Sequence, residues 1–414
     1  MADTENNKNS NSPASTSAPA LRFPGFTEPW QKSPLNHFAK KITRKNKDNS
    51  ISNILSNSAN LGVIPQSDYF DRDIANRENT DGYYVIEHGD FVYNPRKSVT
   101  APFGPVNIYE GQEIGIISPL YLCFQVSGIE PTYLRMFFKG RSWHRFIYEN
   151  GDSGVRHDRV SIKDDLFLQL PVSYPTKEEQ CKITALLSLL DERIATQRRL
   201  IEDLEKLMSS INETLYATLT INYKTSFNEI GCDYGGLTGK SVEDFGKGKP
   251  FITYLNVYQN QIITDYNFDY VEIRDRENQN KVRKGDLLFT LSSETPEEAG
   301  YSAVYMGDAK ELYLNSFCFG IHIPESEMVY PPYMGYLTST SYFRRKIIPY
   351  AQGSTRFNLH KPSLMSMKFS LPAKENQIKI FNTLQLIAKK ISTEQEILSN
   401  FTQQRNYLLT KLFI

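Results

Sequence analysis

The chain has 414 residues, enough for two or three domains, and 40% of them are hydrophobic, so a sizeable core is available. Its 47 basic and 47 acidic residues balance, which argues against a wholesale polyanion binder but leaves local basic surfaces open. The four cysteines lie far apart without a Cys-x-x-Cys pair, so they offer neither a zinc site nor a disulfide framework.

Residues 1–24 are expected to form a disordered tail. The first twenty are polar and rich in Asn, Ser and Pro, without the apolar stretch of a signal peptide. No run of 18 apolar residues occurs in the sequence, which excludes a membrane-spanning helix and a membrane partner. We therefore expect a soluble, cytoplasmic protein.

Residues 25–175 are expected to form a first globular module. A Gly89-Asp90 turn leads into a strand-like run, and β-rich stretches such as Ile114–Phe124 alternate with helical stretches such as Tyr133–Tyr148. Leu170-Pro171 then ends the module. This mixture of short strands and helices predicts a small α+β domain.

A long helix is expected over residues 176–219. Thr176-Lys-Glu-Glu179, just after Pro175, is a capping-box pattern that marks its start. Apolar residues then recur in alternating steps of four and three, which is typical of a coiled-coil seam, and about 1.5 Å per residue gives a length of roughly 65 Å. The seam residues include Ile183, Leu187, Leu190, Ile194, Ile201 and Leu204, with Gln197 as a polar interruption.

The rest of the chain repeats this pattern, with a second module over residues 220–373 and a second helix over residues 374–414. Adding 197 to each seam position gives the second seam, and the polar interruption, Glu394, falls in register. So long a coincidence at one offset is very unlikely to arise by chance. The second seam includes Ile380, Leu384, Ile387, Ile391, Leu398 and Phe401.

The globular parts repeat less strictly. Gly285-Asp286 corresponds to Gly89-Asp90, an offset of 196, whereas Gly353–Ser363 corresponds to Gly151–Ser161, an offset of 202. We predict an α+β fold with two small mixed domains, each followed by a long helix. Because a whole module separates the helices, they are expected to pair as an antiparallel coiled coil; the alternative is that each helix packs on its own module.

Basic residues gather at matching places in both repeats. Residues 328–374 hold seven basic residues and no acidic one, and residues 135–163 hold seven basic and three acidic. Such surfaces, interleaved with aromatic and small polar residues, hold phosphates and read base edges, although a solvated charge is the alternative for any single residue. The residues predicted to contact double-stranded DNA are Asn94, Arg96, Lys97, Ser153, Arg156, His157 and Arg159 in the first module, and Arg344, Arg345, Thr355, Arg356, Asn358, His360 and Lys361 in the second.

Fragments that suggest an enzyme are incomplete. Phe245-Gly-Lys-Gly248 does not follow a clear apolar strand, and Tyr330-Pro-Pro-Tyr333 has Tyr where an adenine methyltransferase needs Asn or Asp. Asp308-Ala-Lys310 lacks the upstream Pro-Asp that would complete a nuclease metal site. No phosphate-binding Gly-x-x-x-x-Gly-Lys-Ser/Thr loop is present, and the six histidines lack metal-ligand spacing. We expect no catalytic residue and no metal site.

Several of these features together resemble the specificity subunits of type I restriction-modification enzymes. They are the opening Leu21-Arg-Phe-Pro-Gly-Phe26 with Trp30, and Leu-Pro followed by Glu178-Glu-Gln180 before the first heptad helix. The same pattern returns as Leu371-Pro and Glu375-Asn-Gln377, and Gly235–Lys240 and Phe251–Val257 also look like parts of such subunits. The resemblance covers nearly all of the chain after the tail; Arg405, at a seam position, departs from the pattern.

The resemblance implies a non-catalytic subunit. Each module would be a target-recognition domain that reads one half of a bipartite DNA sequence, and the paired helices would act as a spacer and as the docking surface for two methyltransferase subunits. S-adenosylmethionine would belong to those subunits, and ATP and Mg to two restriction/translocase subunits where these are present, so this chain would hold no cofactor. Two alternatives stay open: a stand-alone DNA methyltransferase, which would bind S-adenosylmethionine itself, and a coiled-coil scaffold of another complex.

Overall fold

The computed structural model describes residues 18–68, 80–152 and 158–414. Within these ranges the chain divides into two compact units. The first unit comprises the described residues up to Gln197 together with Ile397–Ile414, and the second comprises Arg198–Glu396. Each unit therefore contains one module, the first half of the long helix that follows that module, and the second half of the other long helix.

In the described part of the first unit, short strands form two sheets and a strand pair. One sheet has the antiparallel order β2-β9-β6-β7, and the other has the order β4-β3-β8-β5, in which β3 and β8 run parallel. β1 pairs antiparallel with β10, so the start of the module lies beside its end. The strands are β1 (Gln31–Pro34), β2 (Ala39–Lys41), β3 (Ile54–Ser58), β4 (Gly62–Pro65), β5 (Tyr84–Ile86), β6 (Phe91–Tyr93), β7 (Val106–Ile108), β8 (Gly115–Ile117), β9 (Leu122–Val126) and β10 (Pro171–Tyr174).

Three short helices pack with the β2-β9-β6-β7 sheet to form the core of the first module. Phe91 and Phe124 of neighbouring strands stack at 5.4 Å between ring centres, and Phe138 lies 6.5 Å from each. The first helix starts at a proline, whose fixed φ suits the first helical turn. The helices are α1 (Pro131–Lys139), α2 (His144–Asn150) and α3 (Asp164–Phe167).

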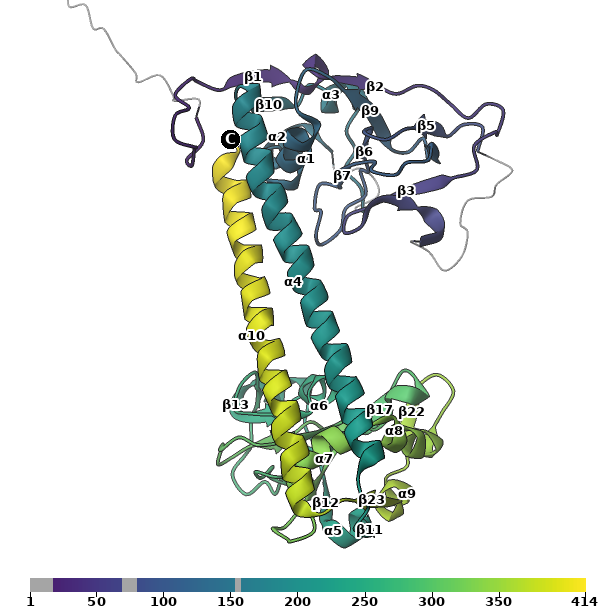
Figure 1. Ribbon diagram of the computed structural model, residues 1–414, viewed down its shortest axis with the longest axis vertical. Coiled ribbons are helices and arrows are strands. Elements are labelled where there is room, and N and C mark those ends of the chain that lie inside the picture. The colour runs from purple at the N-terminus through teal and green to yellow at the C-terminus, as the bar shows by residue number, and fades with distance from the viewer. Residues whose placement is uncertain (1–17, 69–79, 153–157) are drawn as a thin grey trace, which may run out of the picture. The chain divides into compact units, whose positions relative to one another are not determined.

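The long helices α4 (Lys177–Thr218) and α10 (Lys374–Leu412) pair antiparallel (Figure 1). In the first unit, Asp191 of α4 binds Arg405, and Arg193, further along α4, lies 5.2 Å from the ring centre of Phe401, which comes earlier in α10. Arg405, the charged residue of the seam, is therefore paired with a carboxylate of the facing helix. The same carboxylate accepts a 3.4 Å hydrogen bond from Lys139 of α1.

The end of α10 belongs to the core of the first module. Phe413 lies 5.2 Å from the ring centre of Tyr133 and 6.4 Å from that of Phe137, both in α1. Leu408, Leu409 and Leu412 join the same buried cluster. The module thus packs on both long helices and not only on the one that follows it in sequence.

The second unit repeats the strand pair of the first, but its other strands form one larger and two smaller sheets. β11 pairs with β23, and a mixed sheet has the order β12-β20-β16-β18-β14. Smaller sheets have the orders β15-β13-β19 and β17-β22-β21. The strands are β11 (Tyr223–Ser226), β12 (Cys232–Gly235), β13 (Phe245–Ile252), β14 (Ile262–Ile263), β15 (Asp269–Val271), β16 (Leu287–Thr290), β17 (Ser292–Ser293), β18 (Ser302–Tyr305), β19 (Tyr313–Leu314), β20 (Cys318–His322), β21 (Ala351–Gln352), β22 (Phe357–Leu359) and β23 (Lys368–Leu371).

The helices of the second unit begin at recognisable caps. Ser226 and Glu229 form a capping box on α5, and the Thr340 hydroxyl accepts from the Phe343 backbone at the start of α8. The second half of α4 packs on this module, where the buried Asn212 side chain donates to the Tyr336 carbonyl at 2.9 Å. The short helices are α5 (Phe227–Ile230), α6 (Tyr254–Gln259), α7 (Pro331–Leu337), α8 (Ser341–Ile347) and α9 (Lys361–Ser366).

The structure confirms the predicted fold: two mixed modules, each followed by a long helix, with antiparallel pairing. All the predicted seam residues are buried or half-buried. The helix starts at Lys177, although the predicted capping box is only half formed. The Thr176 hydroxyl accepts from the Glu179 backbone at 3.5 Å, but the Glu179 carboxylate binds Arg22 instead.

One glutamine at the start of each long helix fastens that helix to its module. Gln180 accepts a 3.0 Å hydrogen bond from the Glu130 backbone, at the start of α1, and donates to the Pro175 carbonyl at 2.9 Å. Gln377, 197 residues later, accepts at 2.9 Å from the Tyr330 backbone, at the start of α7, and donates to Pro372. The Glu-Glu-Gln and Glu-Asn-Gln motifs therefore have a structural reason.

The repeated Gly-Asp motif also has a structural reason. Gly89 and Gly285 have φ values of 93° and 91°, which favour glycine. The following Asp90 and Asp286 each accept a 2.7 Å hydrogen bond from the backbone three residues earlier, which closes the turn before a buried strand. Burial raises the pKa of both carboxyls.

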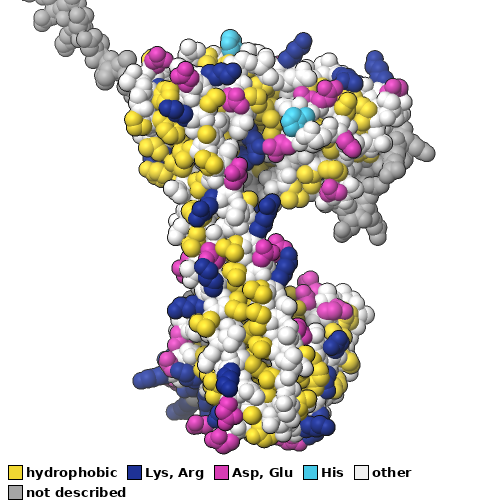
Figure 2. Space-filling view, in the orientation of Figure 1, with side chains coloured by type: hydrophobic (Ala, Val, Ile, Leu, Met, Phe, Trp, Pro, Cys, Tyr) yellow, Lys and Arg dark blue, Asp and Glu magenta, His cyan; other side chains and the backbone are white. Residues whose placement is uncertain are grey.

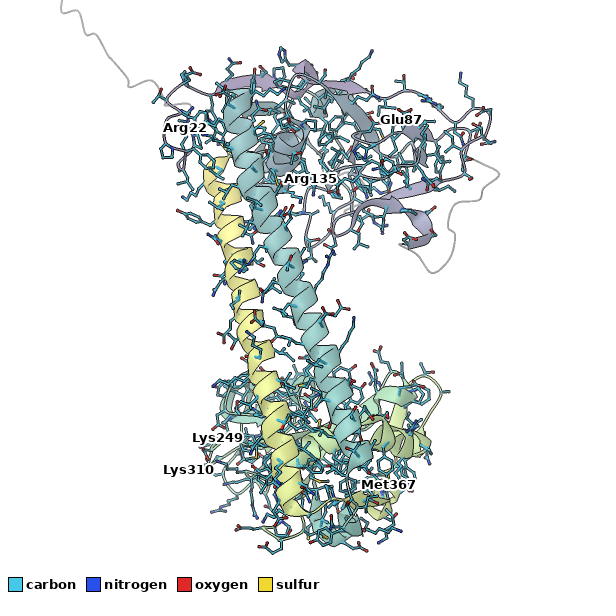
Figure 3. All side chains as sticks on the ribbon, viewed as in Figure 1. Arg22, Glu87, Arg135, Lys249, Lys310 and Met367 are labelled. Atoms are coloured by element: carbon cyan, nitrogen blue, oxygen red, sulfur yellow. The ribbon has the colours of Figure 1, made fainter. Side chains whose placement is uncertain are left out.

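The N-terminal motif lies against both long helices in the first unit (Figure 3). Arg22 binds Glu179 of α4 through two hydrogen bonds of 2.8 Å, and the Glu179 side chain is only 1% exposed. The Leu21 backbone donates to the Lys411 carbonyl of α10 at 3.0 Å, and Lys182 lies over the ring of Phe26. No helix in the described part of the chain is long and apolar enough to cross a membrane.

Candidate nucleic-acid interface

In the second module, a short hairpin carries several of the predicted contact residues, whereas Arg344 and Arg345 lie on α8 and Lys361 lies on α9. The buried strand β16 leads into β17, which pairs antiparallel with β22, and β22 pairs with β21. The turn before β22 needs Gly353, since its φ is 144° and an added Cβ would lie 2.0 Å from the Arg356 carbonyl oxygen. Thr355 and Arg356 are exposed beside this turn.

The first module pairs the equivalent segments. Residues 94–97 follow β6 and lie beside residues 158–161. Val160 donates to the Pro95 carbonyl at 2.9 Å, as Leu359 donates to the Leu291 carbonyl at 2.8 Å in the second module. We call these paired segments the platform: residues 94–97 with 158–161, and residues 291–294 with 357–360.

The platform corrects the predicted alignment of the two loops. Val160 and Leu359 are equivalent, an offset of 359 − 160 = 199, whereas aligning Gly151 with Gly353 had given 202. The glycines do not occupy matching places in the two loops, so they misled the alignment. In the corrected register, Arg96 opposite Arg159 matches Ser292 opposite Asn358.

The platform of the first module brings two predicted contact residues together. Arg96 is exposed and Arg159 half-buried, and both lie about the Asp158 carboxylate, at 3.9 and 4.0 Å. Lys97 is half-buried, and its backbone donates to the Asp158 carbonyl at 2.8 Å. Ion pairs this long hold charges weakly, so the exposed Arg96 guanidinium stays available to phosphates or bases, whereas the Nε of Arg159 is buried. The predicted contacts Ser153, Arg156 and His157 lie outside the described residues.

Two of the predicted contact residues, Asn94 and Arg344, have hydrogen-bond partners inside their own modules. The amide of Asn94 donates to the Asn57 carbonyl at 3.1 Å and accepts from the Arg96 backbone at 3.0 Å, so it holds the loop. Arg344 donates to the carbonyls of Glu297, Ala299 and Gly300, and burial lowers the pKa of its guanidinium. Arg344 therefore stabilises a turn inside the second module.

The acid-free basic stretch of the second module is largely neutralised by residues from elsewhere in the unit. Lys361 pairs with Asp233 at 2.5 Å, and Lys368 pairs with Glu229. Lys346 and Lys374 donate to backbone carbonyls at 3.1 and 2.7 Å. Of the seven basic residues, only Arg345 and Arg356 make no hydrogen bond or ion pair within the described residues, and both are exposed.

The remaining predicted contacts of the second module lie on or beside β22. Asn358 is exposed and stands opposite Ser292. His360 is exposed, and its Nδ1 lies 2.8 Å from the Ser363 hydroxyl. Together with Thr355 and Arg356 they form one polar edge on the platform.

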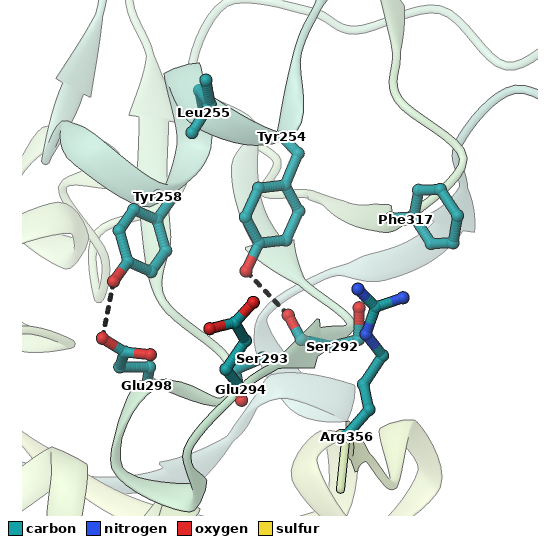
Figure 4. Close-up of a pocket in the computed structure, with 9 residues that line it drawn as sticks. All are labelled: Tyr254, Leu255, Tyr258, Ser292, Ser293, Glu294, Glu298, Phe317 and Arg356. Carbon is teal, nitrogen blue, oxygen red and sulfur yellow. Dashed lines mark hydrogen bonds between the residues drawn. The ribbon is translucent and has the colours of Figure 1, made fainter. Parts of the chain in front are cut away.

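A pocket of about 400 Å³ adjoins this edge, and of its residues only Arg356 had been predicted from the sequence as a contact (Figure 4). Tyr254, Leu255 and Tyr258 come from α6, Ser292, Ser293 and Glu294 from the platform, Glu298 from the turn that follows, Phe317 from the turn before β20, and Arg356 from the hairpin. Tertiary packing alone brings these segments together, so no local sequence pattern could have found them.

The face of each unit that is visible in Figure 2 carries charges of both signs. Lys and Arg side chains are mixed with Asp and Glu there, in keeping with the balanced composition. No group of three His, Cys, Asp or Glu side chains within the described ranges is placed to hold a metal ion. The candidate interface is therefore defined by the platforms and the pocket rather than by a basic field.

Comparison with known proteins connects this architecture to one family. Residues 229–403 match the family model described as the type I restriction modification DNA specificity domain. The MjaVIII type I restriction enzyme specificity subunit of Methanocaldococcus jannaschii is 23% identical over 306 residues, which cover 69% of this chain and 67% of that protein.

Two solved structures share the fold. A chain from a study of complex assembly and conformational transition in a type I restriction-modification system matches with a TM-score of 0.57 and 14% identity, over 94% of this chain and 98% of that one. The type I specificity subunit of M. genitalium matches with a TM-score of 0.53 and 16% identity, over 96% and 99%.

The match to the family model covers most of the second module and most of α10, whereas the two solved structures share the fold of nearly the whole chain. The chain is therefore similar to the specificity subunits of type I restriction-modification systems. Specificity subunits are generally non-catalytic and assemble with the other subunits of their system.

Proposed function

We propose that this chain reads a bipartite DNA sequence, one half through each module, and docks two methyltransferase subunits. The observation that carries the proposal is the platform, because both modules build it at the same place after a buried strand. A duplicated reading surface on two separate modules suits a target with two recognised parts.

The two halves of the target should differ in sequence. The platform positions are equivalent, yet Arg96 and Arg159 in the first module stand where the second has Ser292 and Asn358. Arginine favours guanine, whereas asparagine favours adenine and serine accepts several partners. The same framework therefore presents different chemistry to each half-site.

The long helices would set the gap between the half-sites. Their seams are apolar over most of their length, and Arg405 has a carboxylate partner on the facing helix. S-adenosylmethionine would stay with the methyltransferase subunits, and ATP and Mg with two restriction/translocase subunits where these are present. The purified chain alone should accordingly bind no S-adenosylmethionine; binding would favour a stand-alone methyltransferase.

Exchanging residues 25–175 for the first module of another family member should change one half-site only. The methylated adenines of a host that co-expresses the exchanged chain with its methyltransferase subunit give the readout. The half-site read by the second module and the two-part organisation of the target should stay as in the wild type. A change in both halves would refute independent reading by the two modules.

A further inference from the structure

The pocket beside the platform of the second module is rigid before any ligand binds. The Tyr254 hydroxyl donates to the Ser292 carbonyl at 2.7 Å, and the Tyr258 hydroxyl donates to Glu298 at 2.7 Å. The two rings stack at 5.8 Å, and the bond to Glu298 raises the pKa of Tyr258 to about 12. An aromatic wall is thus fixed in place, so little conformational freedom is lost when it is covered.

Two apolar side chains are exposed to solvent at the edge of this aromatic wall. Leu255 and Phe317 both line the pocket, and each is 57% exposed. Solvated aromatic and aliphatic groups beside a shaped hollow are typical of a surface that is covered by a ligand.

Two charged side chains of opposite sign face the same hollow without binding each other. In Figure 4 the Glu294 carboxylate and the Arg356 guanidinium stand on opposite sides of Ser292. Neither makes a hydrogen bond or ion pair within the described residues. Lys361 and Lys368, two other residues of the basic stretch, are paired with carboxylates, whereas Arg356 and Glu294, unpaired in the described part of the chain, line the pocket.

We propose that Arg356 and Glu294 read the two bases of a single G·C pair in the half-site of the second module. This inference rests on the proposed function. Arg356 would donate both ends of its guanidinium to O6 and N7 of guanine, and Glu294 would accept from the N4 amino group of cytosine.

Of the two residues, Glu294 gives the stronger argument for a base contact. A carboxylate at a DNA surface is repelled by phosphates, and a hydrogen bond accepted from a base amino group offsets this repulsion. Cytosine presents such a donor in the major groove directly beside the guanine acceptors that arginine favours. The fixed rings of Tyr254 and Tyr258 exclude water from one side, which strengthens both polar contacts.

The test maps methylated adenines in hosts that co-express the chain with its methyltransferase subunit. The variants are Arg356→Ala, Arg356→Lys and Glu294→Ala. The controls are Lys310→Ala and Glu325→Ala, which change exposed charges of the same unit away from the pocket. Competition between duplexes that differ at one base pair, with purified complexes, gives a second readout that does not need methylation in the host.

The wild type should require G·C at one position of the second half-site. All three pocket variants should relax that same position, with methylation or binding of the other base pairs rising about tenfold or more against G·C, and the first half-site unchanged. Arg356→Lys is included because lysine keeps the charge but loses the two-pronged geometry. The controls should retain the wild-type preference.

Unchanged discrimination in the pocket variants, or relaxation of different positions by the Arg356 and Glu294 variants, would overturn the inference while leaving the proposed function intact. If the wild type itself gave no two-part target, the proposed function would fail first. The two failures are therefore distinguishable in one data set.

Discussion

Replacing Arg22 by alanine is expected to lower the free energy of unfolding of the first unit by about 3 kcal/mol, because it leaves a buried carboxylate without its partner. Glu179 is 1% exposed and binds Arg22 through two charge-assisted hydrogen bonds of 2.8 Å. No other cation is bonded to this carboxylate within the described residues. The loss should also loosen the N-terminal segment that bonds to the end of α10.

Tryptophan fluorescence measures this loss selectively. Both tryptophans of the chain, Trp30 and Trp143, are buried in the first module, so their urea transition reports on that unit. Arg145→Ala is the matched control, since Arg145 forms an exposed pair with Glu149 and its removal should leave the transition unchanged. Equal transitions for the two variants would contradict the role given to Arg22.

Replacing Gln377 by leucine is expected to destabilise the second unit by about 3 kcal/mol while sparing the first. Gln377 is fully buried, and its amide serves the Tyr330 backbone N–H and the carbonyls of Met328 and Pro372. Leucine fills a similar volume but leaves these three groups unpaired, at about 1 kcal/mol or more for each.

The two glutamines of the repeat provide a reciprocal experiment. Gln377→Leu should shift the urea transition seen by far-ultraviolet circular dichroism but not the tryptophan transition. Gln180→Leu should shift the tryptophan transition, because Gln180 lies in the first unit. The exposed Gln395→Leu, also in the second unit, should change neither by more than about 1 kcal/mol. If Gln377→Leu shifted the urea transition seen by tryptophan fluorescence as much as Gln180→Leu does, each glutamine would not act only within its own unit.

The long helices were predictable because the heptad pattern is local. A seam repeats every 3.5 residues whatever the rest of the chain does, and duplication at one offset identified both helices. The sequence did not reveal that each module also packs on the end of the other helix. That contact depends on Phe413 meeting Tyr133, which are far apart in the chain.

The contact residues were less predictable because charge neutralisation is not local. Lys361 and Lys368 find carboxylates 128 and 139 residues away, and Arg344 finds carbonyls 44 to 47 residues away. A stretch without acidic residues therefore overstated the basic surface. The pocket was missed for the same reason, since Tyr254 meets Ser292 only through the folded sheet.

The central claim is that two modules read two separated half-sites. Sequencing the methylated adenines in DNA from a host that co-expresses this chain with its methyltransferase subunit tests it most directly. We expect one asymmetric target made of two short recognised parts with a fixed number of unspecified bases between them. A single uninterrupted target, or a gap of variable length, would contradict the account.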